Sequence, residues 1–224
     1  MADRAGIDEG LRAYMLRVYN YMASGLAITG VVAYFAAVSG LYVAIAQTPL
    51  IWLVIFAPLG LVLLLSARVH KMSTGAAQLA FWSFAALMGL SLSYVFLAYT
   101  GTSITRVFLI TAASFGALSL YGYTTGKDLS GWGSFLFMGL IGLILAMIVN
   151  IFLGSSALQF AISVIGVLVF TGLTAYDTQQ IKEMYYQGDS TAVAGRKAIM
   201  GALRLYLDFI NLFIMLLHLF GNRE

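Results

Sequence analysis

Long runs without a charged residue dominate this sequence and set its fold class. One run of 50 residues lies between Arg17 and Arg68, and another of 48 lies between Asp128 and Asp177. A helix that crosses a bilayer needs about 20 predominantly apolar residues, so each run is long enough for two crossings. Of the whole chain, 61% is hydrophobic and only 9% is charged, against roughly 45–50% and roughly 25% in soluble domains, which excludes an ordinary soluble domain.

Polar interruptions divide the 224 residues into seven predicted spans. Residues 46–49 and 150–156 break the two longest runs into hairpins. The other three spans are expected between Lys71 and Arg106, over 107–126 and over about 202–220, with the longest loop over 178–197. We therefore expect an all-α integral membrane protein with seven transmembrane helices, folded as a single domain over 1–224.

Basic residues predict the orientation of these spans. With seven crossings, Arg106 and Arg223 fall on one side of the membrane, and all the other Lys and Arg residues fall on the side of the N-terminus. Cytoplasmic loops carry the excess of basic residues, so we expect a short cytoplasmic segment over about 1–17 and a C-terminus outside. The chain is then a multi-pass protein of the cell membrane. Basic residues this dispersed form no patch for nucleic acid.

The chain contains no cysteine. This excludes a disulfide framework, a thiolate metal site and a cysteine nucleophile. Serines within apolar helices are more often packing groups than nucleophiles. We therefore expect no cofactor and no enzymatic activity.

Asp208 is a charged residue placed at membrane depth. Only 14 uncharged residues separate it from Arg223, and they cover about 21 Å of helix, less than the roughly 30 Å of the hydrocarbon layer. Residues three or four positions apart share a helix face, which predicts a largely polar stripe of Arg204, Asp208, Asn211, Met215 and His218. Such a stripe is expected to face protein or a cavity rather than lipid.

A second carboxylate and an arginine are predicted at the same depth. Asp177 closes the sixth span and Arg68 ends the second, both on the cytoplasmic side, and Thr174 adds a hydroxyl one turn before Asp177. Two carboxylates in a low-dielectric site cannot both ionise at low cost, so the pair shares a proton, recruits an arginine or binds a cation. Each of these outcomes gives the pair a charge state that can be switched.

A purely structural interpretation of the same residues stays open. Asp208 would then pair with Arg204, four positions earlier on its own helix, and Asp177 would cap a solvated helix end near Lys182. The sequence alone does not bring the two aspartates into contact.

Two segments carry a resemblance to a known family. Residues 174–182, TAYDTQQIK, and residues 205–213, LYLDFINLF, resemble the two signatures of the Bax inhibitor-1 family, also called the TMBIM family. The likeness extends over essentially the whole chain and suggests a bacterial member, which implies the inner membrane. It also implies a bundle in which the seventh span is surrounded by the other six.

The resemblance implies a function as well. Family members are associated with a pH-sensitive calcium leak, and the residues matching Asp177 and Asp208 form a di-aspartyl pH sensor. In the family, an arginine at the end of the second span is linked to the gating carboxylate, and Arg68 is the best match in this sequence. The implied partners are calcium ions, protons and the bilayer. Calcium would bind weakly at the two aspartates, because a pair of carboxylates supplies few of the roughly six to eight oxygens that it prefers, and Asn211, backbone carbonyls or water would complete the site.

Two rival functions remain. Bacterial relatives in this family are linked to a membrane-bound AAA protease, so the chain would be a non-channel regulator that binds such a protease or another complex. An intramembrane aspartyl protease also needs two membrane aspartates, and Tyr176-Asp177 is similar to its first motif. The second motif of that class, Gly-x-Gly-Asp, is absent before Asp208, where the sequence is Leu205-Tyr206-Leu207.

Overall fold

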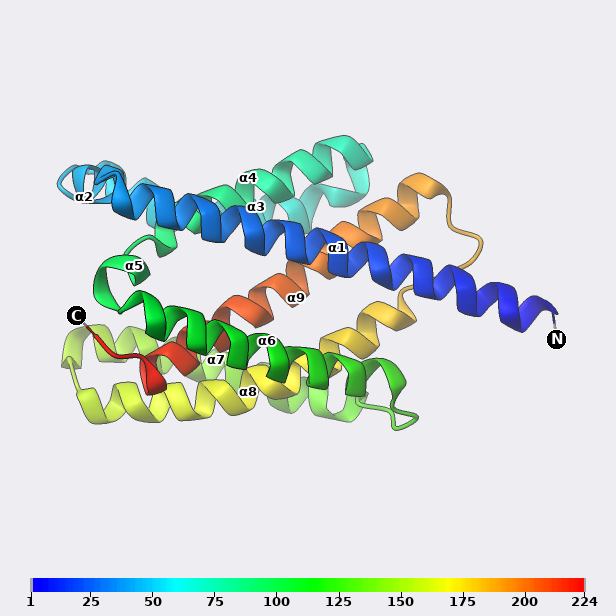
Figure 1. Ribbon diagram of the computed structural model, residues 1–224. Helices are drawn as coiled ribbons and strands as arrows, with labels where there is room; N and C mark the ends of the chain where they lie inside the picture. The colour runs from blue at the N-terminus through cyan, green and yellow to red at the C-terminus, as the bar shows by residue number, and fades with distance from the viewer. Residues whose placement is uncertain (1, 224) are drawn as a thin grey trace. The chain divides into compact units, whose positions relative to one another are not determined.

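The structure is a computed structural model that describes the backbone of residues 2–223 and the side chains of residues 9–223. Met1 and Glu224, the two ends of the predicted domain, lie outside the described residues. Within the described part the chain is almost entirely α-helical, apart from one isolated antiparallel bridge between Tyr99 and Arg223 (Figure 1). Seven of its helical segments are long and apolar enough to cross a membrane, so the predicted fold class is confirmed.

The helices group into two compact units. The first contains α1 (Ala2–Val38), α2 (Leu41–Ala46), α3 (Leu50–Arg68), the short 3-10 helix η1 (Val69–Lys71), α4 (Thr74–Leu92), α5 (Val95–Ala98) and the beginning of α9 (Thr191–Phe220), as far as Tyr206. The second contains α6 (Gly101–Thr124), α7 (Ser130–Leu153), α8 (Ser156–Glu183) and α9 from Leu207 onward. Helix α9 contributes to both units as one unbroken helix. The single domain over 1–224 stays a prediction.

In the first unit, α4 packs against both α1 and α3. The contact with α1 is close because Gly89 has no side chain: an added Cβ would lie 2.6 Å from the carbonyl oxygen of Thr29. Phe81 and Phe84 on α4 are fully buried, and both rings meet the ring of Tyr206 edge-on. An aromatic cluster therefore fixes the beginning of α9 in this unit.

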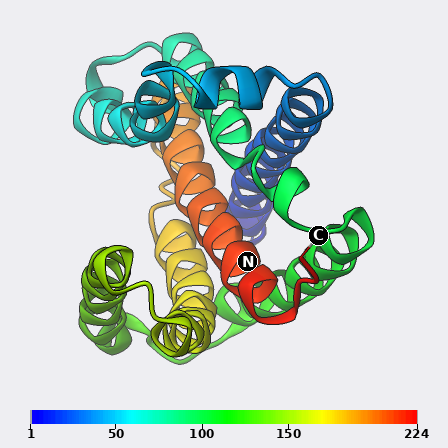
Figure 2. The ribbon, with the colours of Figure 1, turned by 90° about the vertical axis from the view of Figure 1, so that its left-hand side faces the viewer.

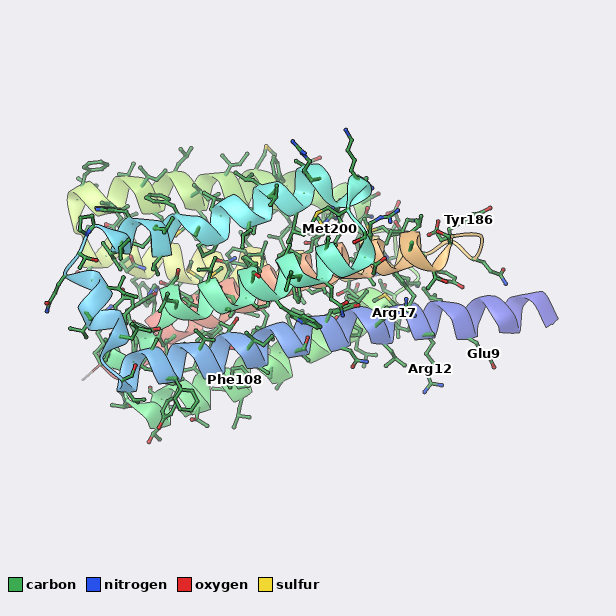
Figure 3. The ribbon with its side chains drawn as sticks, turned by 90° about the horizontal axis from the view of Figure 1, so that it is seen from above. Glu9, Arg12, Arg17, Phe108, Tyr186 and Met200 are labelled. Atoms are coloured by element: carbon green, nitrogen blue, oxygen red, sulfur yellow. The ribbon has the colours of Figure 1, made fainter. Side chains whose placement is uncertain are left out.

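The N-terminal helix begins earlier than expected. The predicted cytoplasmic segment over about 1–17 is helical from Ala2 and continues without a break into the first span, Glu9–Val38. Figure 3 shows Glu9 and Arg12 extending away from α1, and both side chains are exposed. The charged residues here are compatible with a helix, so the charge marks where the apolar part begins rather than where the helix begins.

In the second unit, α6 and α8 run parallel. The hydroxyl oxygens of Ser119 and Thr178 lie 2.9 Å apart, and one turn further along both helices the Lys182 ammonium donates to the Tyr123 carbonyl at 2.9 Å. Close packing continues at Gly122, where an added Cβ would overlap a backbone carbonyl oxygen of α8. The helices α7 and α8 form a hairpin (Figure 2), and Leu136 of α7 packs on α8.

The predicted long loop over 178–197 is mostly helical, so that prediction is wrong. Helix α8 continues to Glu183 and α9 begins at Thr191, which leaves only residues 184–190 as a connection. Thr178 and Gln179 are buried and make hydrogen bonds to α6 and to the α6–α7 connection. The side chains of Thr178 and Gln179 thus bond other parts of the protein instead of water, whereas the sequence analysis took the polar stretch for a loop in contact with water.

The helix predicted over 107–126 also begins earlier than expected, so it too is longer than predicted. Helix α6 begins at Gly101, not at residue 107, because the Thr100 hydroxyl accepts a hydrogen bond from the Ser103 N–H and caps the helix there. Arg106 therefore lies within a span, where its guanidinium donates to the Phe220 carbonyl at 3.2 Å.

Helix α9 is more buried than the other spans: 72% of its most apolar stretch is buried, against 11% to 39% for the rest. Its position amid the other six helices stays a prediction.

Candidate functional site

Asp208 and Asp177 belong to the second unit, on α9 and α8 respectively. Asp208 is only 5% exposed and Asp177 is half-buried. Asp177 does not close its helix as predicted, since α8 continues for six more residues to Glu183. Neither aspartate is isolated, because each takes part in at least one interaction.

The contacts between α8 and α9 set the relative level of the two aspartates. The two helices run antiparallel: Gln159 near the start of α8 lies 3.2 Å from His218 near the end of α9, and further along Gly166 packs against Met215. This direction brings the C-terminal part of α8 toward the middle of α9. Asp177 and Asp208 therefore lie on approaching stretches of adjacent helices.

Helix α6 gives an independent measure of that level. Its Phe115 ring contacts Phe209 on α9 with 5.5 Å between ring centroids, and one turn later its Ser119 pairs with Thr178 on α8. Each of these two partners directly follows an aspartate in the sequence. Four residues of helix rise about 6 Å along the axis, so the levels of the two carboxyl-bearing positions differ by about one turn.

Thr174 and Asn211, predicted to support the pair, belong to the same unit. Thr174 is fully buried and its hydroxyl donates to the Phe170 carbonyl at 2.8 Å. The Asn211 side-chain amide likewise donates to the Leu207 carbonyl at 2.8 Å. The Thr174 hydroxyl and the Asn211 amide nitrogen thus donate within their own helices. The atom that each residue could offer to a cation is its side-chain oxygen.

Arg68 and Arg204, the two predicted basic neighbours, fall in the first unit. Arg68 is the last residue of α3, as predicted, and is exposed. Arg204 is also exposed and lies one turn before Asp208 on α9. The role of Arg68 as gate partner, and any effect of Arg204 on the pair, stay predictions.

Three polar residues that follow Asp177 tie α8 to its neighbours, and we call them the α8 brace: Thr178, Gln179 and Lys182. The Gln179 side chain accepts a hydrogen bond from the Leu129 N–H at 2.8 Å and donates one to the Lys127 carbonyl at 2.9 Å. It is 5% exposed. Sequence reasoning missed this brace because it assigned these residues to a loop; their place beside a signature aspartate was the available signal.

The α6–α7 connection held by the brace also contains an exposed carboxylate. Hydrogen bonds from the side chain and backbone N–H of Ser130 lower the pKa of Asp128 below its usual value. Asp128 is therefore an ionised, solvent-facing carboxylate in the same unit as the two aspartates.

Comparison with known proteins gives one family. A family model described as "Inhibitor of apoptosis-promoting Bax1" matches residues 11–224. The chain is 53% identical over 218 residues to an uncharacterized protein of Rickettsia prowazekii, a match that covers 97% of this chain and 92% of that one. It is 51% identical over 219 residues to the inner membrane protein YbhL of Escherichia coli, covering 96% and 94%. An uncharacterized membrane protein of Streptococcus pyogenes is 38% identical over 221 residues, covering 97% and 96%.

Proposed function

Because this chain belongs to the Bax inhibitor-1 family, we propose that it is a pH-sensitive calcium leak channel of the membrane, gated by a proton sensor formed by Asp177 and Asp208. One observation supports the proposal: two apolar spans of one compact unit pack antiparallel, with the positions of Asp177 and Asp208 at levels that differ by about one helical turn along the axis. Carboxylates inside membrane spans are costly and mark ion or proton paths.

The charge of the pair supplies the switch. With one shared proton the pair carries a charge of about −1, and full ionisation leaves a charge of about −2 at one level of the unit. The additional negative charge either repels α8 from α9 or attracts a cation. Protonation therefore biases the helices between two arrangements, closed and open.

Calcium is the cation that the proposal assigns to this site, bound weakly. Among the described residues, no three His, Cys, Asp or Glu side chains lie together as a group that could hold a metal ion. Two carboxylates would need further oxygens from Asn211, from backbone carbonyls or from water. A site with so few charged ligands binds loosely, which suits an ion in transit. The proposed role is not enzymatic and needs no cofactor.

Calcium efflux from liposomes tests the proposal. The purified chain is reconstituted alone, and efflux is recorded with a calcium indicator from pH 5 to pH 8 for the wild type, Asp177→Asn and Asp208→Asn. Both variants should lose the pH dependence while they keep their helical circular dichroism. Asp128→Asn is the matched control, because it removes an exposed carboxylate of the same unit and should behave as the wild type.

Two outcomes would reject the channel. If efflux from wild-type liposomes equals that from empty ones at every pH, the chain does not conduct on its own, and a regulator of a membrane protease becomes the better explanation. If both aspartate variants retain the wild-type pH profile, the sensor lies elsewhere.

A further inference from the structure

A polar cavity of about 400 Å³ lies in the second unit, at the end where α9 terminates. We call it the outer pocket. Its polar lining comes from the end of α7, the start of α8 and the end of α9 with the residues that follow it, and includes Asn150, Ser155, Gln159, Ser163, His218 and Arg223. None of these residues has a part in the proposed proton sensor.

Hydrogen bonds hold the lining of the outer pocket in place. Gln159 is the centre: its side-chain oxygen accepts from the Asn150 amide at 3.3 Å, and its amide nitrogen lies 3.2 Å from Nδ1 of His218. Asn150 in turn accepts from the backbone N–H of Ser155 at 3.0 Å. Three helices thus present side chains fixed by one another, which lowers the entropy lost when a ligand binds.

The charge of the pocket points to an anion. Arg223 is a permanent cation, whereas the described residues that line the pocket include no Asp or Glu. The guanidinium carbon of Arg223 lies 5.8 Å from the centre of the Tyr99 ring, which positions the charge. A divalent metal ion, which prefers carboxylate oxygens, is disfavoured here.

The surroundings of the pocket are apolar and exposed. Phe160 lines the pocket and is 64% exposed, and Phe152 near the end of α7 is 84% exposed. Large apolar side chains at the end of a membrane span are stable in contact with lipid, and the ends of α7, α8 and α9 that form the pocket are ends of such spans. We infer that the pocket faces the level of the lipid headgroups.

We propose that the outer pocket binds a phosphate group, supplied by the headgroup of an anionic phospholipid. The Arg223 guanidinium pairs with the phosphate oxygens. The Ser155 hydroxyl, which accepts a hydrogen bond from the Leu158 N–H at 3.2 Å, donates its own proton to the phosphate. The exposed phenylalanines lie beside the acyl chains. The proposal is independent of calcium conduction.

Thermal unfolding of the delipidated protein in detergent measures this binding. Three probes are titrated: dioctanoyl phosphatidylglycerol, dioctanoylglycerol, which lacks the phosphate, and inorganic phosphate. Phosphatidylglycerol should raise the unfolding temperature in a saturable manner, and dioctanoylglycerol should not. An equal response to inorganic phosphate would identify free phosphate as the source of the group, and no response to it would identify the lipid.

Three variants show where the phosphate binds. Arg223→Gln should weaken binding by about tenfold or more, because it removes charge-assisted hydrogen bonds. Gln159→Glu should weaken it as well, because it places a negative charge in the pocket while keeping Arg223. Arg106→Gln is the matched control: it removes an arginine at the same end of the unit that is not among the described lining residues, and it should bind as the wild type does.

Clear results overturn the proposal. It fails if dioctanoylglycerol stabilises the protein as much as phosphatidylglycerol does, since the phosphate then contributes nothing. It fails equally if neither phosphate probe binds, or if Arg106→Gln loses as much affinity as Arg223→Gln.

Discussion

The hydroxyl oxygens of Tyr206 and Thr29 lie 2.6 Å apart in the buried interior of the first unit. Thr29 donates its own proton to the Ala85 carbonyl at 2.8 Å, so Tyr206 is the donor to Thr29. A chain of two hydrogen bonds therefore joins α9, α1 and α4, and it begins two residues before Asp208.

These two hydrogen bonds predict that Tyr206→Phe destabilises the protein mildly. The substitution removes one buried hydrogen bond and leaves Thr29 bonded to Ala85, so the expected loss of unfolding free energy is about 1 kcal/mol. Thermal unfolding in detergent measures it. Thr29→Val should cost more, because it also leaves the Tyr206 hydroxyl buried without its acceptor; an equal or smaller loss would contradict the proposed donor order.

Two glycines of α6 should respond in opposite ways to alanine. Gly122→Ala places a methyl group against a backbone carbonyl of α8, so the helices must separate, at a cost of about 1–3 kcal/mol. Gly116→Ala meets nothing within 4 Å and gains helix propensity, so it should leave stability unchanged or raise it by up to about 1 kcal/mol. Unfolding temperatures of the two variants check the difference. Similar values would mean that α6 and α8 do not pack as closely as described.

Removing the Gln179 side chain should loosen the α6–α7 connection. In Gln179→Ala the Leu129 N–H and the Lys127 carbonyl lose their partner, and backbone exchange there should rise. Hydrogen–deuterium exchange over residues 127–129 measures this. Gln187→Ala, on the exposed 184–190 connection, is the control and should leave exchange at 127–129 unchanged.

The predicted gate partner can be tested by the pH profile of calcium efflux. If Arg68 pairs with the aspartates, Arg68→Ala removes a charge that favours ionisation, and the pH midpoint should rise. The basal leak should change with it. Arg106→Ala, predicted on the other side of the membrane, should leave the midpoint in place. Superimposable curves for Arg68→Ala and the wild type would leave Arg68 as a determinant of orientation alone.

The predicted orientation rests on the distribution of the basic residues and can be checked directly. Single cysteines at Ser190 and Asn222 lie in exposed segments of a chain that has no cysteine of its own. An impermeant maleimide added outside should label the second position and not the first. Labelling of both from the same side would exclude seven crossings.

Sequence reasoning located the spans because hydrophobic length is a local property. The two longest uncharged runs, each broken near its middle, gave the hairpins α1–α3 and α7–α8. It failed over 178–197, where Gln179 is polar because it bonds another segment, and a polar side chain looks the same in a sequence whether it bonds protein or water. Asp208 was singled out by its predicted depth and Asp177 by its predicted place at the end of the sixth span, and their role as a pair stays a prediction. The outer pocket was missed because only the fold brings Gln159 and Arg223, which are far apart in the sequence, to the lining of one pocket.

Lys182 donates to the Tyr123 carbonyl, near the C-terminal end of α6, and also lies over the ring of that residue. Carbonyl groups in the last turn of a helix have no partner within it and carry the negative end of its dipole. The ammonium group neutralises this end, as a capping residue does. The same lysine is thus one of the basic residues on which the predicted orientation rests and the group that completes the terminus of another span.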